Sequence, residues 1–285
     1  MYKLKKRLKN EKGQGMVEYG LILALVSIVA ILGLSTLGGN IKGQLEGIAD
    51  SMESFESFEP GQGPWYSDEE IDDLIKNHHF IPVATADELN NVRSATSETY
   101  GTGTKWEGPY TGGLDKKYIQ VAYIDLRGIE TFEPIGKLRS EFTGTFDGGG
   151  YIISNLTIDK GSESYVGLFG RDTGATFKNV GLEDVNVTGG SHTGGLVGYQ
   201  YESSTVSNSY ATGSVTGTGT GAGGLVGSQD GASVSNSYWD KDTTGQEASE
   251  GGTGKSTAEM KNKDTYTDWD NTIWEFKDGQ YPTLR

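Results

Sequence analysis

The hydrophobic pattern divides the chain into two contrasting parts. Residues 19–41 are uncharged and mainly apolar, and apolar residues then continue at steps of three or four, at Leu34, Leu37, Ile41, Leu45, Ile48, Met52 and Phe55. This spacing is typical of one helix face and predicts a long helix that ends near residue 57. At about 1.5 Å per residue the uncharged run spans roughly 35 Å, enough to cross the hydrocarbon core of a membrane.

The second part repeats short apolar groups between glycines. A Gly-Leu-x-Gly motif begins at Gly167, Gly195 and Gly224, with spacings of 28 and 29 residues. A second motif follows each copy, as FKNVGL at Phe177, VSNSYA at Val206 and VSNSYW at Val234, and IISNLT at Ile152 resembles an earlier copy. Such repeats are typical of solenoids. We therefore predict a long N-terminal α-helix and an all-β head, a right-handed parallel β-helix (β-solenoid) with N- and C-terminal caps.

The repeats also predict which side chains stack inside the coil. Leu168, Leu196 and Leu225 are expected in its core. Four asparagines are assigned to one repeated position: Asn155, Asn179, Asn208 and Asn236. Because stacked strands lie about 4.8 Å apart, equivalent amides can form a hydrogen-bonded ladder.

The predicted boundaries follow the composition. They are a basic leader at residues 1–13, a hydrophobic and amphipathic helix at 14–57, a turn-rich linker at 58–67 and the head at 68–285. Within the head, a helix is expected over residues 85–94, with Thr85 as its cap and Glu88 three positions later.

Composition and charge exclude several functions. The chain has 285 residues, 44 Gly, 6 Pro and no Cys, which favours a turn-dense β fold and excludes disulfides and thiolate chemistry. Its net charge of −15 argues against a nucleic-acid partner. The first twelve positions hold six basic residues: Lys3, Lys5, Lys6, Arg7, Lys9 and Lys12. The positive-inside rule therefore places the N-terminus in the cytoplasm and the head outside.

The stretch Gly13-Gln14-Gly15-Met16-Val17-Glu18-Tyr19, followed by the apolar helix, resembles the processing region of Flp (type IVb, Tad-type) pilins. The resemblance implies cleavage after Gly13 by a prepilin peptidase, which leaves Gln14 first and Glu18 and Tyr19 fifth and sixth. It also implies the pilus assembly machinery and other copies of the chain as partners.

Glu18 then has a physical interpretation. Its carboxylate can neutralise the new ammonium group of Gln14 in a neighbouring subunit, so that neither charge stays unpaired in an apolar fibre core. The alternative is a Glu18 that is solvated at the membrane interface.

The head resembles GLUG-repeat bacterial surface proteins over roughly residues 80–285, on FTGTFDGGGYIISNLTI, the VGLFG block and YWDKDTTGQ. These repeats occur in adhesins and in non-catalytic parts of IgA-cleaving metallopeptidases. The HExxH motif of those peptidases is absent from the sequence, so the resemblance does not imply peptidase activity.

Other candidate sites have simpler interpretations. His78, His79 and His192 do not have the spacing of a metal site, and the calcium-loop-like run from Asp240 has its acid displaced to Glu250. We predict no metal, no cofactor and no catalytic residue. Trp239, Trp269, Trp274 and Tyr281 are interpreted as covering an open solenoid end rather than as a carbohydrate platform. Two N-x-T sequons occur, at Asn155 and Asn186, of which Asn186 is expected to face outward.

The sequence as a whole predicts a structural pilin subunit. It is expected in the inner (cytoplasmic) membrane as a precursor and then in an extracellular pilus, with a head that serves adhesion or protects the fibre surface and has a possible surface or glycan ligand. The alternatives are a minor or tip pilin and a membrane-anchored adhesin that does not polymerise. A third is a glycan-active enzyme that uses Asp147, Glu183 or Asp184.

Overall fold

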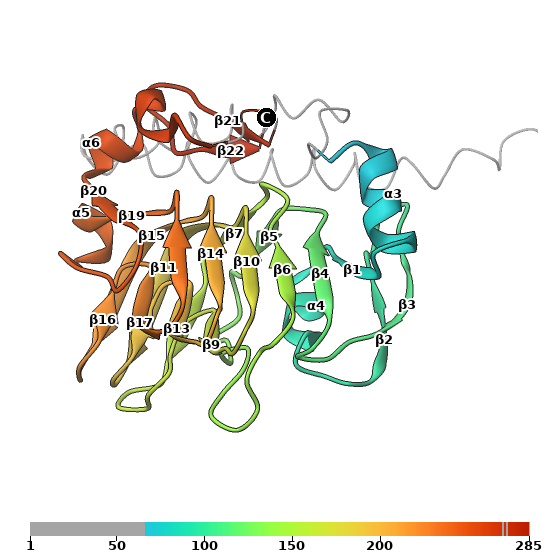
Figure 1. Cartoon of the computed structure of the whole chain (residues 1–285), viewed down its shortest axis with the longest axis horizontal. Helices are drawn as coiled ribbons and strands as arrows, with labels where there is room; N and C mark the ends of the chain where they lie inside the picture. The colour runs from blue at the N-terminus through green and yellow to red at the C-terminus, as the bar shows by residue number, and fades with distance from the viewer. Residues whose placement is uncertain (1–65, 270, 272, 285) are drawn as a thin grey trace, which may run out of the picture. The chain divides into compact units, whose positions relative to one another are not determined.

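The computed structural model describes residues 66–269, 271 and 273–284, and these form one unit (Figure 1). The predicted leader, the pilin-like helix and most of the linker lie outside the described residues. Among the described residues, no helix is long and apolar enough to cross a membrane.

Parallel sheets form most of this unit. The six-stranded sheet has the order β1 (Phe80–Val83), β4 (Lys117–Gln120), β6 (Thr145–Asp147), β10 (Thr176–Lys178), β14 (Thr205–Ser207), β18 (Ser233–Ser235). The seven-stranded sheet has the order β20 (Thr253–Lys255), β19 (Tyr238–Asp240), β15 (Tyr210–Gly217), β11 (Gly181–Gly189), β7 (Ile152–Ser154), β5 (Ile124–Asp125), and β8 (Thr157–Asp159) also pairs with β11. Two further parallel sheets are β17 (Val226–Asp230), β13 (Val197–Tyr201), β9 (Phe169–Arg171), and β12 (Thr193–Gly194) with β16 (Ala222–Gly223).

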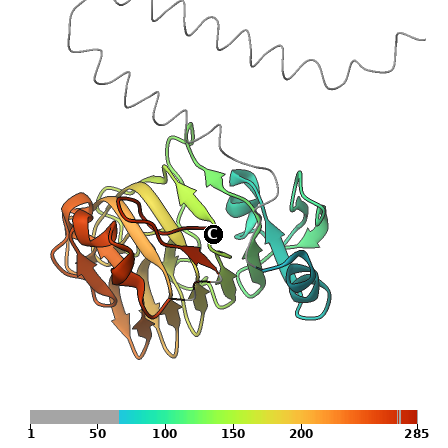
Figure 2. The same cartoon turned by 90° about the horizontal axis from the view of Figure 1, so that it is seen from above.

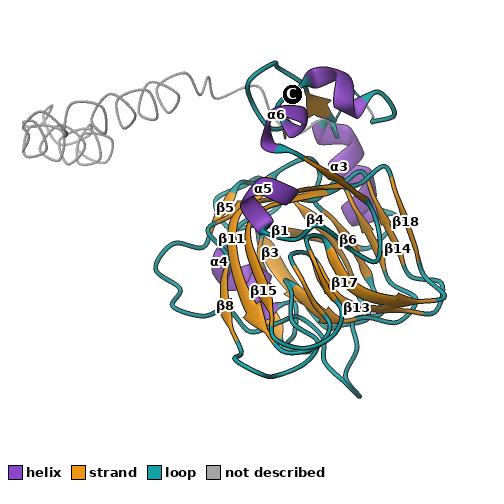
Figure 3. Cartoon of the chain, turned by 90° about the vertical axis from the view of Figure 1, so that its left-hand side faces the viewer, coloured by secondary structure: helices purple, strands orange, loops and turns teal. Residues whose placement is uncertain are grey.

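Consecutive turns of the chain stack in the predicted repeat register. Val197 pairs with Phe169 on one side and with Val226 on the other, so each turn advances by 28 or 29 residues. The repeated leucines Leu168, Leu196 and Leu225 are completely buried in one continuous hydrophobic core. Figure 3 looks along the coil and shows its strands surrounding this interior. The predicted parallel β-solenoid is therefore confirmed.

The second glycine of each Gly-Leu-x-Gly motif is required by the stacking. A Cβ atom on Gly170, Gly198 or Gly227 would lie 2.5, 2.6 or 2.6 Å from the carbonyl oxygen of the glycine one turn earlier. Such contacts are far below van der Waals distance, and the atoms in the way belong to the backbone. Glycine therefore recurs because only a residue without Cβ lets these turns approach.

Two helices and a hairpin lie at the N-terminal end of the solenoid. They are α3 (Asp68–Lys76), α4 (Ala86–Asn91) and the antiparallel pair β2 (Ser97–Tyr100) and β3 (Gly108–Thr111). Helix α3 was not predicted. It begins with a capping box between Ser67 and Glu70, and its buried Ile71 packs against Phe80 of β1.

Helix α4 confirms the expected cap, because Thr85 accepts a hydrogen bond from the Glu88 backbone N–H. The Glu88 side chain does not complete a capping box. Its buried carboxylate instead accepts bonds from the backbone N–H groups of Ala84, Gly101 and Thr102, at 2.7, 2.9 and 2.8 Å. One carboxylate therefore joins the start of α4 to the β2–β3 hairpin.

The C-terminal segment contains α5 (Lys241–Thr244), α6 (Thr257–Met260), a 3₁₀-helix (Lys263–Tyr266), and the antiparallel strands β21 (Trp274–Glu275) and β22 (Thr283–Leu284). Its part after β20 lies along the coil, over several turns, as Figures 1 and 2 show. Trp269 and Trp274 pack there against Ile152, Tyr210 and Tyr238, which belong to different turns.

This placement corrects the role predicted for three of the four C-terminal aromatic residues. Trp269, Trp274 and Tyr281 cover a flank of the solenoid rather than its open end. Trp239 lies inside the main core, where its indole N–H donates to the Gln246 carbonyl at 2.8 Å. The flank needs a cover because Ile152, Tyr210 and Tyr238 occupy one column of paired strands and together form an apolar stripe.

Candidate functional site

The predicted processing and assembly site lies outside the described residues. Its members are Gly13, Gln14, Glu18 and Tyr19.

The solenoid asparagines can be placed, and three of them share a position. Asn179, Asn208 and Asn236 each follow a strand of the six-stranded sheet, and their φ angles are 54°, 47° and 42°. Asparagine tolerates this left-handed conformation better than most residues, so it recurs where the chain turns a corner.

The assignment of Asn155 to that position is wrong. Strand β7 pairs Ile152–Ser154 with Gly181–Glu183, so Asn155 stands beside Asp184 at a different corner. Asn155 has φ 58° and Asp184 has φ 53°, which again indicates a backbone role. The two corners look alike in sequence because both require a small polar residue that accepts positive φ.

The asparagine side chains form hydrogen bonds with groups other than a neighbouring amide. Asn155 donates to Asp125, Asn179 to Asp147, and Asn236 to the backbone carbonyl of Asp268. The inter-turn contacts that sequence reasoning missed are made by serines. Ser209 and Ser237, both buried, accept bonds from the backbone N–H groups of Val180 and Ser209, one turn earlier, at 3.1 and 3.2 Å. The second serine of each S-N-S-Y repeat was the available signal.

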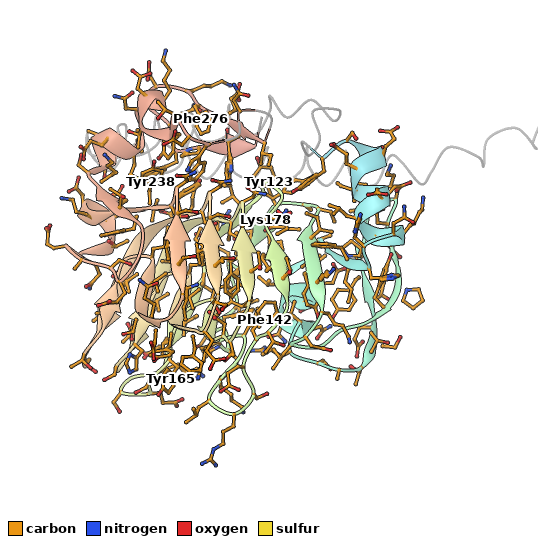
Figure 4. The ribbon with its side chains drawn as sticks, viewed as in Figure 1. Tyr123, Phe142, Tyr165, Lys178, Tyr238 and Phe276 are labelled. Carbon is orange, nitrogen blue, oxygen red and sulfur yellow. The ribbon has the colours of Figure 1, made fainter. Side chains whose placement is uncertain are left out.

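A partly buried ion pair ties the end of the predicted linker to the solenoid. Asp147 of β6 is completely buried and lies 2.9 Å from the Lys178 ammonium. The Tyr66 hydroxyl donates to Asp147 at 2.8 Å and accepts from Lys178 at 3.1 Å. Tyr66 therefore belongs to the head although it falls in the predicted linker. We call these three residues the entry latch; Figure 4 labels Lys178.

The electrostatics of the latch follow from burial and proximity. Burial, together with the neighbouring Asp147 carboxylate, raises the pKa of Tyr66 to about 12. Burial alone would lower the pKa of Lys178, but Asp147 reverses this and raises it overall. Tyr66 thus stays a neutral hydrogen-bond donor and Lys178 stays charged at physiological pH. Asp147 also accepts from Asn179 and from the Gly149 N–H, at 3.0 Å each, so its oxygens are fully used.

The other two acids considered for glycan chemistry have separate structural partners. Glu183 binds the Tyr210 hydroxyl at 2.5 Å under the C-terminal segment, and burial raises its pKa. Asp184 forms an exposed corner, where its N–H donates to Thr212. Neither acid shares a partner with Asp147, so the structure does not bring the three together as one site.

Asp240 is the centre of a polar turn and not a calcium loop. It caps α5 through bonds from the N–H groups of Asp242 and Thr243, at 2.9 and 3.2 Å. Its other oxygen accepts from the hydroxyls of Thr257 and Tyr281 at 2.7 and 2.5 Å. The carboxylate is completely buried and faces protein donors, which leaves no free oxygen for a cation.

The remaining candidates are dispersed over the head. His78 lies 3.3 Å from Asp73 on the exposed end of α3, whereas His192 stacks on Tyr165 far along the chain. Within the described part, no group of three or more His, Cys, Asp or Glu side chains is arranged to hold a metal. Asn186 of the second sequon is exposed on β11, as expected.

The fold defines the described part as a parallel β-solenoid, and the comparisons with known proteins refine this. Residues 7–52 match the family described as Flp/Fap pilin component, and residues 189–216 match the GLUG motif. Both matches confirm the resemblances predicted from GQGMVEYG and from the Gly-Leu-x-Gly repeats. The chain therefore combines a pilin-like N-terminal region with a GLUG-containing solenoid.

Two individual proteins are similar to parts of the chain. A segment of 103 residues is 42% identical to Halomucin of Haloquadratum walsbyi, and it covers 35% of this chain but only 1% of Halomucin. A solved structure from Bacteroides ovatus, provisionally described as an immunoglobulin A1 protease, covers 80% of this chain and 95% of its own. It is 15% identical with a TM-score of 0.39, which is too low to support any conclusion.

Proposed function

We propose that the chain is a structural subunit of an extracellular filament of the Flp type, and that its solenoid is the surface-exposed head. The observation that carries the proposal is the match of residues 7–52 to the Flp/Fap pilin component, joined in one chain to a solenoid with its own core. The pilin-like region supplies the polymerising helix and the head covers the fibre.

The proposed route to the filament has three steps. The precursor is held in the inner membrane with its N-terminus in the cytoplasm, a prepilin peptidase cleaves after Gly13, and the assembly machinery packs the helices into a fibre. The Glu18 carboxylate then neutralises the Gln14 ammonium of a neighbouring subunit. Leaving one partner of a buried ion pair unpaired costs about 3–5 kcal/mol, so the pairing is strong enough to decide assembly.

The experiment is the intact mass and N-terminal sequence of the principal protein in filaments sheared from producing cells. A chain that starts at Gln14 and forms most of the filament supports the proposal. A chain found only in membranes, with residues 1–13 still attached, contradicts it and favours an anchored adhesin that does not polymerise. A chain at low abundance among other subunits favours a minor or tip pilin.

The role of Glu18 has its own variant and control. We expect Glu18→Ala to abolish filaments while the amount of precursor in the membrane stays unchanged, by electron microscopy and immunoblotting. Glu11→Ala is the matched control, because it removes a carboxylate from the leader that is cleaved away. Normal filaments from the Glu18→Ala strain would falsify the pairing.

The proposal assigns no catalytic role to the head. Support comes from the acids considered for glycan chemistry, since Asp147 is saturated by the entry latch and Glu183 is bound to Tyr210. Incubating the full-length chain with a panel of polysaccharides tests this. Release of shorter sugars would contradict the structural role.

A further inference from the structure

A cluster of aromatic and cationic side chains is formed by strands β9 and β13 and by the two residues that precede Val166 and β12. It consists of Tyr165, Arg171, His192, Tyr199 and Tyr201, all only partly buried, and we call it the open aromatic face. The Arg171 guanidinium lies 5.3, 4.6 and 5.4 Å from the ring centres of Tyr165, Tyr199 and Tyr201. Figure 4 shows Tyr165 at the edge of the molecule opposite Phe276 of the C-terminal segment.

The rings of this face are held in a fixed arrangement. Tyr165 and His192 stack with 5.1 Å between centroids and 6° between planes, and Tyr199 meets both edge-on. His192 Nδ1 lies 2.7 Å from the Ser228 hydroxyl. Because each ring is positioned by another, a ligand that contacts the face does not have to order these side chains first.

Arg171 retains unused hydrogen-bonding capacity. Its Nε donates to Glu141 at 3.2 Å, and the two side chains are only 15% and 24% exposed. No hydrogen bond to its two terminal nitrogens is found within the described residues. A guanidinium that is fixed at Nε and free at its fork suits the bidentate recognition of a carboxylate.

A cationic turn projects beside Arg171. Lys137 and Ser140 exchange two backbone hydrogen bonds of 2.9 Å, and Arg139 has φ 70° at the tip of this turn. Both ends of the turn are anchored to Arg171, since the Arg171 N–H donates to Gly136 and its carbonyl accepts from Phe142. Leu138 is 52% exposed, and neither Lys137 nor Arg139 has an ion pair among the residues that the structure describes.

The charge of this region contrasts with that of the chain. Lys137 and Arg139 stand on a turn whose two ends are bonded to the Arg171 backbone, in a protein of net charge −15. Glu141 pairs with Arg171, and Glu202 and Asp230 lie near the Tyr201 hydroxyl. Interactions between exposed charges fade beyond about 8 Å at physiological ionic strength, so an anionic ligand is best placed against the Arg171 fork and the turn, away from the acids beside Tyr201. The ligand that best complements this region is therefore an anion that also presents an apolar surface to the tyrosine rings.

We propose that the open aromatic face, together with the Lys137–Ser140 turn, binds a polysaccharide whose sugar rings carry carboxylates. The tyrosine rings contact the C–H faces of the sugars, and Arg171, Lys137 and Arg139 contact the carboxylates. The inference deepens the proposed function, because it names the ligand class of the head. It needs only the described solenoid, whether or not the chain polymerises.

The experiment uses the full-length chain in detergent and measures binding of polygalacturonate by isothermal titration calorimetry at physiological salt. Fully methyl-esterified polygalacturonate is the matched probe, since it keeps the sugar rings and loses the charge. We expect the free acid to bind and the ester to bind at least tenfold more weakly. Equal binding of the two probes, or no binding of either, overturns the proposal.

Two variants locate the site. The double variant Lys137→Gln/Arg139→Asn keeps a residue that tolerates positive φ at the turn, and we expect it to weaken binding about three- to tenfold. Arg171→Lys keeps a charge for Glu141 but loses the planar fork, and we expect a loss at least as large. Unchanged affinity in both variants places the ligand elsewhere and overturns the proposal.

The matched control is Lys263→Gln/Lys277→Gln, which removes the same charge from exposed positions in the C-terminal segment. We expect it to bind polygalacturonate as the parent chain does. Binding to phosphatidylglycerol vesicles but not to polygalacturonate would assign the cationic turn to a membrane surface instead. If this control lost as much binding as the turn variant, net charge and not a specific site would explain the effect. Either result rejects the proposed site, and neither depends on filament formation.

Discussion

The solenoid carries aromatic side chains on two of its sides, and only one side is covered. On the covered flank, Tyr210 and Tyr238 lie under Trp269 and Trp274 of the C-terminal segment, and the two tryptophans are at most 5% exposed. On the open aromatic face, Tyr165 and Tyr199 lie around Arg171 and stay partly exposed. The tyrosines of the covered flank therefore stabilise the fold, because water is excluded from them. Those of the open aromatic face remain accessible to a ligand.

The core residues beneath the two sides also differ, in their polarity. Beneath the covered flank, Leu182 and Ala211 contribute apolar side chains to the core. Beneath the open aromatic face, Asp172, directly after β9, and Gln200 of β13 are completely buried. Asp172 Oδ2 and both amide atoms of Gln200 lack a partner within the described residues. Buried polar atoms without partners destabilise a fold. The covered flank also has one such atom, Trp274 Nε1, so this cost is larger beneath the open side.

The largest expected effect is on the covered flank. Trp274→Ala should lower the free energy of unfolding by about 3–5 kcal/mol, because it removes a fully buried ring and leaves a cavity. Tyr199→Ala on the open aromatic face should cost about 1 kcal/mol or less. Urea unfolding followed by circular dichroism measures both. Equal costs would mean that the two sides contribute alike.

The pH dependence of stability is expected to arise beneath the open side. Burial raises the pKa of Asp172 to about 7, against smaller opposing effects of Ser204, the Tyr201 N–H and Arg171. Because the folded pKa is raised, the stability that this group contributes is complete below its unfolded pKa of about 4 and is lost as pH rises through about 7.

Asp172→Asn cannot ionise and should not show this loss. Between pH 5 and pH 8 the parent chain should therefore lose about 2 kcal/mol of stability relative to the Asp172→Asn variant. Urea unfolding at the two pH values gives the difference. Asp230→Asn, at the exposed end of β17, is the control and should follow the parent chain. If the Asp172→Asn variant also follows the parent chain, ionisation of Asp172 is not the cause of the lost stability.

The smallest expected effect is at the corner that leads into the covered flank. Asn208→Val forces a β-branched residue into φ 47° and should cost about 1–2 kcal/mol. Asn208→Gly should cost less than about 0.5 kcal/mol, because glycine accepts this conformation freely. Thermal unfolding compares the two variants. An equal loss in both would show that the amide itself stabilises the coil, as a ladder would.

The repeats allowed the stacking to be predicted well but not the detail at the corners. Spacings of 28 and 29 residues predicted the pairing of β9, β13 and β17 and the burial of Leu168, Leu196 and Leu225. The position of Asn155 was wrong because two different corners select the same residue type. Helix α3 was missed, although Ser67 and Glu70 form a capping box, because acidic residues dominate its sequence.

The sequence by itself determined the features that depend on neighbours along the chain or on a regular repeat. These are the parallel coil, the glycines between its turns, the cap of α4 and the pilin-like N-terminal motif, because local sterics and periodic burial suffice to specify them. The tertiary structure alone decided which side of the coil the C-terminal tryptophans cover, where Tyr66 meets Asp147 and Lys178, and that Arg171 lies among three tyrosines. Those contacts join residues far apart in sequence, and no periodicity of the chain encodes which distant partner a side chain will meet.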